Sequence, residues 1–389
     1  MHIHPLITDT ATLTALCERL AKSSFVAVDT EFMRENTYWP ILCLIQIGDE
    51  TEAAAVDPLA DGLDLKPLLD LLVNNEDVLK VVHAGSQDIE IVHNLTGKTP
   101  HPIFDTQIAQ MALSENEQIG YVQLVEEWVG EQVDKGARFT DWAQRPLTTK
   151  QLDYAVGDVT HLAAIFPKML ARLQKTGRGE WLNAEMERLA DPANYRTDPD
   201  VAWERVKIAS RKPVVLGRLK ALAAWREGFA QKRDLPRGRV MKDETLGDLA
   251  LNPPRSQADL AKVRGLSGAW SSNEGGRAVM AALADATPLP DEEMPDVERR
   301  GRGGGKQSKL VGDLLKLLLK IRCQELGVAS RLIARSGELD RLAGGARDDL
   351  ALLDGWRYDV FGHEAVDLVD GRVGFAVADG KLALSRLEA

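Results

Sequence analysis

Two acidic residues close a short apolar run near the start of the chain. Phe25-Val-Ala-Val28 is typical of a strand, and Asp29 and Glu31 follow it. Residues i and i+2 of a strand share a face, so both carboxylates can point to one site. Two acids on one face repel each other unless a cation lies between them, and Mg²⁺ or Mn²⁺ prefers such oxygen ligands. Taken alone, the pair fits a solvated strand end better, because a lone Asp-x-Glu sequence is common.

A third acid, Asp88, lies where a helix is expected to begin after the apolar run at 78–82. Ser86 is the predicted N-cap of that helix, which leaves Asp88 free to face outward. Gly85 permits a close approach of the backbone. The alternative is structural, because an acid in the first turn interacts favourably with the helix dipole by about 0.3–1 kcal/mol.

Tyr154 and Asp158 are one turn apart in a long predicted helix. Side chains at i and i+4 project from one face, so the phenol and the carboxylate can reach the same site. Gly157 between them costs about 1 kcal/mol relative to alanine in a helix, which indicates a packing or access requirement. An ordinary tyrosine–acid pair at a helix surface is the alternative.

Nearby residues have simpler interpretations. Asp105 is predicted to cap a helix and Asp153 to be a surface acid. Trp142 is predicted to pack in the core, with base stacking as the alternative. Three basic residues of the same region could contact phosphates or belong to a solvated loop, namely Lys135, Arg138 and Arg145.

The elements that must position these residues belong to an α/β domain over residues 1–200. Short apolar runs predict strands at 25–29, 41–47, 53–56, 78–82 and 102–104, and helical patterns begin at 87, at 106 and over 148–173. The first three strands lie close together in sequence, which favours an antiparallel meander. We therefore expect a mixed sheet flanked by helices.

Helical periodicity dominates the rest of the chain. Two helical domains are predicted at 205–288 and 308–375, separated by a flexible linker at 289–307 that is rich in proline, acids and glycine. Between 201 and 240, eleven basic minus three acidic residues give +8, although the chain as a whole carries −11. Such a patch suits a phosphate backbone, with a solvated helix face as the alternative.

In this order, the acids and the tyrosine resemble the DEDD family of 3′→5′ exonucleases, in the subclass with tyrosine in the third motif, and ribonuclease D in particular. The two helical blocks resemble the paired HRDC domains that follow the nuclease domain in bacterial ribonuclease D. The resemblance covers essentially the whole chain. It implies an α/β ribonuclease H-like exonuclease domain followed by two all-α HRDC-like domains. The segments that carry it in the nuclease domain are 26–32, 37–47, 83–88, 104–107, 141–147 and 151–158.

The resemblance also implies a two-metal site. Two divalent ions, Mg²⁺ or Mn²⁺, would be held by Asp29, Glu31, Asp88 and Asp158. Asp29, Glu31 and Asp158 would hold the ion that activates water. Asp29 and Asp88 would place the second ion near the leaving oxygen. Tyr154 would align the attacking water, since a phenol with a pKa near 10 is a poor base.

The expected activity is trimming of the 3′ ends of structured RNA such as tRNA precursors, with release of nucleoside 5′-monophosphates. Two alternatives stay open: an exonuclease acting on single-stranded DNA, and a catalytically silent nucleic-acid tether. The intact acid set disfavours the tether.

Composition limits where such a protein would act. No apolar run approaches the ~20 residues that span a bilayer, and no signal peptide is visible. Cys17, Cys43 and Cys323 are scattered and form no CxxC pair, which fits a reducing cytoplasm. We therefore expect a cytoplasmic monomer without a membrane partner.

Overall fold

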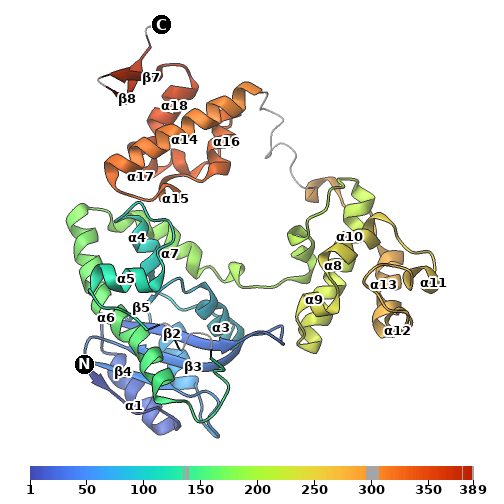
Figure 1. The fold of residues 1–389 in the computed structure, drawn as a ribbon, viewed down its shortest axis with the longest axis horizontal. Helices are drawn as coiled ribbons and strands as arrows, with labels where there is room; N and C mark the ends of the chain where they lie inside the picture. The colour runs from blue at the N-terminus through green and yellow to red at the C-terminus, as the bar shows by residue number, and fades with distance from the viewer. Residues whose placement is uncertain (135, 137–139, 295–305, 379, 388–389) are drawn as a thin grey trace.

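A six-stranded mixed sheet lies at the centre of the N-terminal domain in the computed structural model, which describes residues 1–134, 136, 140–294, 306–378 and 380–387 (Figure 1). The strand order is β1-β4-β3-β2-β5-β6. β2, β3 and β4 are antiparallel neighbours, which confirms the predicted meander, whereas β5 and β6 run parallel to β2. The bounds are β1 (His2–Ile3), β2 (Phe25–Met33), β3 (Ile41–Gly48), β4 (Glu52–Val56), β5 (Leu79–Val82) and β6 (Ile103–Asp105).

Helices cover both faces of this sheet, because successive side chains of its strands point to opposite faces and both faces are apolar. In β2, Val26 and Val28 belong to one core and Phe25 and Ala27 to the other. The first core is covered by α1 (Thr10–Leu20), α2 (Lys66–Val73) and α3 (Ser86–Thr96), and the second by α4 (Thr106–Met111), α5 (Tyr121–Trp128) and α6 (Thr149–Thr176). Of these helices, α1, α2 and α5 were not predicted from the sequence.

The long helix α6 is defined by strong signals at both ends. Thr148 caps it, and the Gln151 side chain returns a hydrogen bond to the Thr148 backbone, which forms a capping box. Gly177 ends the helix with a φ of 67°, a conformation that glycine adopts without strain. The helix packs across β2, β3 and β4, and it confirms the prediction over 148–173.

The first helical domain extends slightly beyond its predicted bounds. The short helix η3 (Pro199–Arg205) brings Trp203 into its core, and Leu289 is buried in the same core. The predicted linker at 289–307 therefore begins later than predicted, and its residues 295–305 lie outside the described ones. The helices are α8 (Pro213–Arg233), α9 (Arg237–Val240), α10 (Asp243–Leu251), α11 (Gln257–Leu260), α12 (Gly268–Ser272) and α13 (Glu274–Asp285).

The second helical domain ends differently from the prediction. An all-α block was expected over 308–375, but the chain closes with a two-stranded antiparallel sheet of β7 (Val373–Ala378) and β8 (Lys381–Arg386). Before this hairpin come α14 (Lys306–Leu326), α15 (Ser330–Ile333), α16 (Ser336–Ala343), α17 (Gly355–Arg357) and α18 (His363–Val369).

The two helical domains contact the N-terminal domain at separate places. The second helical domain docks on α4 and on the turn between α6 and α7 (Asn183–Ala190). There, Ala329 N donates to Met111 O at 2.8 Å, and Arg178 donates to Ala112 O at 2.9 Å and to Leu326 O at 2.7 Å. The Trp181 and Trp356 rings stack with their centroids 4.2 Å apart.

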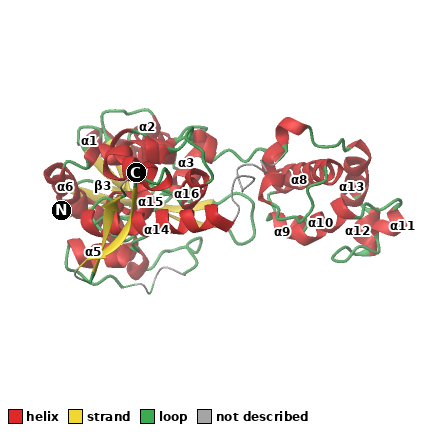
Figure 2. Ribbon diagram, turned by 90° about the horizontal axis from the view of Figure 1, so that it is seen from above, coloured by secondary structure: helices red, strands yellow, loops and turns green. Residues whose placement is uncertain are grey.

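The loop between β2 and β3 contacts the first helical domain, whose helices lie to one side of the N-terminal domain (Figure 2). The backbone N–H groups of Tyr38 and Trp39 donate to the Asp234 carboxylate at 2.9 and 3.0 Å, and the Tyr38 hydroxyl donates to the buried Glu227. Among the described residues, no helix is long and apolar enough to cross a membrane.

Candidate active site

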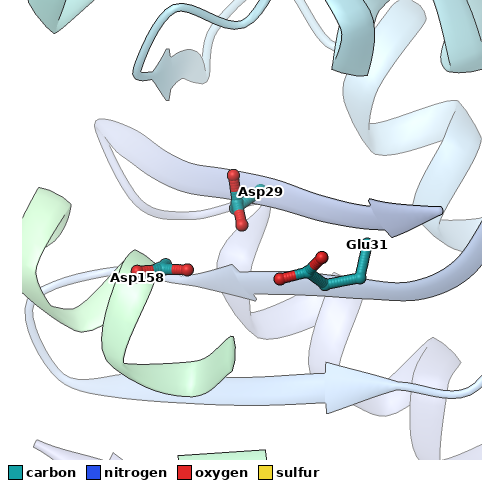
Figure 3. Close-up of side chains that lie close together, drawn as sticks. All are labelled: Asp29, Glu31 and Asp158. Carbon is teal, nitrogen blue, oxygen red and sulfur yellow. The ribbon is translucent and has the colours of Figure 1, made fainter. Parts of the chain in front are cut away.

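Three of the predicted acids meet on the sheet face that α6 covers (Figure 3). Asp29 and Glu31 project from β2, and Asp158 projects from α6. One carboxylate oxygen of each lies within 4.8 Å of the others, close enough for a single cation to contact all three. The strand alternation thus brings Asp29 and Glu31 to one face as predicted.

Asp88 lines the same cleft beside these three acids but lies outside their close group. It lies in the first turn of α3, and its carboxylate accepts a hydrogen bond from the Thr30 hydroxyl. The predicted N-cap at Ser86 is wrong, because Gly85 holds the cap position and Ser86 begins the helix. A Cβ on Gly85 would lie 2.5 Å from the Val82 side chain, which explains why glycine turns the chain here.

The acids lie in a cleft of about 1120 Å³. Tyr154 contributes to its wall, one turn before Asp158 on α6. Trp142 is 2% exposed and lies with its ring centroid 6.2 Å from that of Tyr154, which confirms packing and leaves no free face for a base. Other lining residues include His83, Gln87, Gln107, Tyr121, Gln123, Glu126 and Asp141.

The electrostatics of the cleft disfavour the charged forms of Asp29 and Asp88. Burial first, and then the neighbouring carboxylates of Asp88, Asp158 and Glu31, raise the pKa of Asp29 well above its usual value. Burial raises the pKa of Asp88 to about 6, although the Thr30 hydroxyl opposes this. A site of this kind favours a cation, because a divalent ion between the carboxylates would offset both the burial and the repulsion.

Tyr121, which was not predicted from the sequence, supports α6 at Asp158. Its hydroxyl donates to the main-chain carbonyl of Asp158 at 2.9 Å and lies 3.0 Å from His161 Nδ1. The His161 ring therefore packs beside Tyr121. No local pattern marks Tyr121, because it comes from α5, a helix that only the tertiary structure brings to α6.

The nearby polar residues have structural partners. Asp105 caps α4 by accepting from Gln107 N and Ile108 N, as predicted. Asp153 is exposed, also as predicted. Arg145 forms an ion pair with Asp57 at 2.6 Å, so a phosphate contact would have to break that pair. Lys135 and Arg138, the other basic residues of that region, lie outside the described residues.

Comparisons with known proteins agree with this architecture. Residues 5–174 match the family model of a 3′-5′ exonuclease, and residues 215–283 match that of the HRDC domain. Ribonuclease D of Sphingobium indicum is 64% identical over 388 residues, and that of Zymomonas mobilis is 58% identical over 388, with each comparison covering 100% of both chains. The crystal structure of Escherichia coli RNase D, described as an exoribonuclease involved in structured RNA processing, superposes with a TM-score of 0.78 at 30% identity and covers 94% of this chain and 98% of that one.

The fold and the matched models define a ribonuclease H-like 3′→5′ exonuclease with a helical HRDC domain. With relatives this similar over its full length, the chain belongs to the ribonuclease D family. It is therefore a 3′→5′ exoribonuclease, a hydrolase of phosphodiester bonds. The alternatives of a DNA exonuclease and of a silent tether are not supported.

Proposed function

We propose that the chain is a two-metal-ion enzyme of the DEDD type, in the tyrosine subclass, and that it trims the 3′ ends of structured RNA such as tRNA precursors. The products are nucleoside 5′-monophosphates. The observation that carries the proposal is the convergence of Asp29, Glu31 and Asp158 within 4.8 Å in a cleft that Asp88 and Tyr154 also line.

The acids suit two hard divalent ions, Mg²⁺ or Mn²⁺. Asp29, Glu31 and Asp158 would hold one ion, since each offers an oxygen to a common point. Asp88 lies apart from that group, and its charge acts on Asp29, so these two acids would share the second ion. When bound, the ions would activate the attacking water and neutralise charge on the phosphate and the leaving oxygen.

Tyr154 would orient rather than deprotonate the attacking water. Its phenol enters the cleft one turn before Asp158, and the packed Trp142 ring restricts its movement. A phenol with an ordinary pKa near 10 stays protonated at neutral pH, so it can hydrogen-bond water without acting as a base. Tyr121 holds the main chain of α6 at Asp158 and so fixes the position of both groups.

The first helical domain would bind the body of the RNA. Several of its basic residues are used internally, such as Arg226 with Asp243 and Arg237 with Glu227. Other basic side chains remain exposed and could contact phosphates, namely Arg205, Lys207, Arg211, Lys212, Lys232 and Arg239. Residues 205–288 and 308–375 would form the first and second HRDC-like domains of a cytoplasmic monomer.

The test uses a tRNA precursor with a 3′ extension and a single-stranded DNA of matched sequence and length. With Mg²⁺ or Mn²⁺, we expect the RNA to be shortened from its 3′ end with release of nucleoside monophosphates, and much faster than the DNA. Equal rates on both polymers would remove the RNA assignment. Products with internal cuts would remove the exonuclease mechanism for this site.

A further inference from the structure

Gln46 is an unusual residue for the interior of the sheet, next to the acids of the site. It lies in β3 at the centre of the sheet and its exposed fraction is 0%. Neither Nε2 nor Oε1 of its amide has a hydrogen-bond partner among the described residues. An amide carries two donor hydrogens and an acceptor oxygen, and burying them unpaired costs free energy, so an apolar residue would be more stable here.

The register of the sheet places Gln46 next to Asp29. The two residues are direct partners across β2 and β3, so their side chains leave the same face with Cβ atoms about 4.5–5.5 Å apart. The partner of Gln46 on the other side, in β4, is Ala55, which offers only a methyl group. Leu44, two residues earlier on the same face, is apolar. Asp29 is therefore the one polar side chain among these neighbours.

Buried polar groups without partners are rare in folded proteins, and when they occur beside a site they point to a functional role. Carboxylates that bind metals are themselves held by hydrogen bonds, which fix the orientation of the binding oxygen. Only the Nε2–H end of the amide can face a carboxylate, because two acceptor oxygens repel each other.

We infer that Gln46 is a positioning residue for Asp29: in the metal-loaded enzyme its Nε2–H group donates to the Asp29 oxygen that faces the sheet. The other Asp29 oxygen then points into the cleft, toward the two ions that Asp29 is proposed to share. This inference rests on the proposed role of Asp29 as a metal ligand. It explains why the centre of an apolar strand contains an amide that the fold itself does not use.

The test replaces Gln46 with methionine, which has a similar volume and no amide. Ile47→Met is the matched control, because Ile47 is equally buried in the same strand but faces the opposite core. In EDTA, we expect Gln46→Met to raise Tm by about 2–8 °C, since an unpaired buried amide is removed. With Mn²⁺, the concentration that half-saturates the thermal shift should rise about 10–100-fold and kcat should fall, while KM for RNA stays unchanged.

The outcomes separate this inference from the proposed function. A Gln46→Met protein with parental Mn²⁺ half-saturation and kcat would overturn the role of Gln46. A lowered Tm in EDTA would also overturn it, because Gln46 would then be needed by the fold itself. Asp29→Asn serves as the reference: if that variant keeps its Mn²⁺ response and its activity, the proposed metal site fails instead.

Discussion

Replacing Asp88 by asparagine removes one charge from the cleft while keeping the shape of the side chain. The amide oxygen can still accept the hydrogen bond from the Thr30 hydroxyl. Without metal, the carboxylate of Asp88 is unfavourable because burial opposes its charge. We therefore expect Asp88→Asn to be more stable than the parent in EDTA and less stable than the parent in saturating Mn²⁺.

The size of the effect follows from the pKa. Asp88 has a pKa of about 6 against an ordinary 3.8, and this difference of about 2.2 pKa units corresponds to about 3 kcal/mol. Below pH 4, an acid with a raised pKa is neutral in both the folded and the unfolded state and does not affect stability. As the pH rises through 6, its ionisation lowers the free energy of unfolding. At pH 7.5, the free energy of unfolding of Asp88→Asn should exceed that of the parent by up to about 3 kcal/mol, which corresponds to about 6–12 °C in the Tm of the nuclease domain.

The assay is thermal unfolding of parent and variant at pH 4 and pH 7.5, in EDTA and in Mn²⁺. Asp153→Asn is the matched control, since Asp153 is exposed on α6 outside the cleft and should change Tm little. Mn²⁺ at 100 times its Kd should stabilise the parent by about 2.7 kcal/mol. If the Tm of Asp88→Asn exceeds that of the parent by the same amount at both pH values, or does not exceed it in EDTA, the electrostatic reasoning is wrong.

Three further predictions concern other parts of the molecule. Tyr154→Phe should lower kcat about 100-fold and leave the Kd for RNA unchanged, as measured by single-turnover kinetics and binding titration, and parental turnover would remove Tyr154 from the mechanism. Trp356→Ala loses the stack on Trp181, so hydrogen exchange of the Ala329 amide, which donates to Met111 O across the same docking contact, should accelerate about tenfold; unchanged exchange would show that the stack does not hold this contact. Lys80 is buried with a pKa lowered to about 8, and its amine donates to the backbone carbonyls of Asn75 and His101. Because the folded state then binds fewer protons than the unfolded state, stability should rise between pH 8 and 10.5 by up to about 3 kcal/mol, and urea unfolding of Lys80→Met should show no such rise.

Local patterns predicted the parts of the site that depend on a single element. Asp29 and Glu31 share a face because strands alternate, and Tyr154 and Asp158 share one because a helix turns every 3.6 residues. Their convergence depends on α6 crossing β2, a contact between residues more than 120 positions apart that no local pattern reports. The prediction that these four residues form one site came from the resemblance to ribonuclease D and not from their spacing.

The errors also have physical causes. Ser86 is a good capping residue, but the tight packing of Gly85 on Val82 moves the helix start by one position. The hairpin of β7 and β8 had a visible signal, since Asp379-Gly380 separates two apolar runs. Gln46 could not be predicted as a site residue, because its position beside Asp29 depends on the register between β2 and β3.

The most direct measurement is the digestion of a 3′-extended tRNA precursor by the purified protein and by Asp29→Asn, with Mg²⁺ and with EDTA. We expect a ladder of 3′-shortened RNA and free nucleoside 5′-monophosphates from the parent in Mg²⁺. We expect this ladder to be lost in EDTA and in Asp29→Asn. Shortening that persists in EDTA, or an active Asp29→Asn protein, would contradict a metal-dependent exoribonuclease site at these acids.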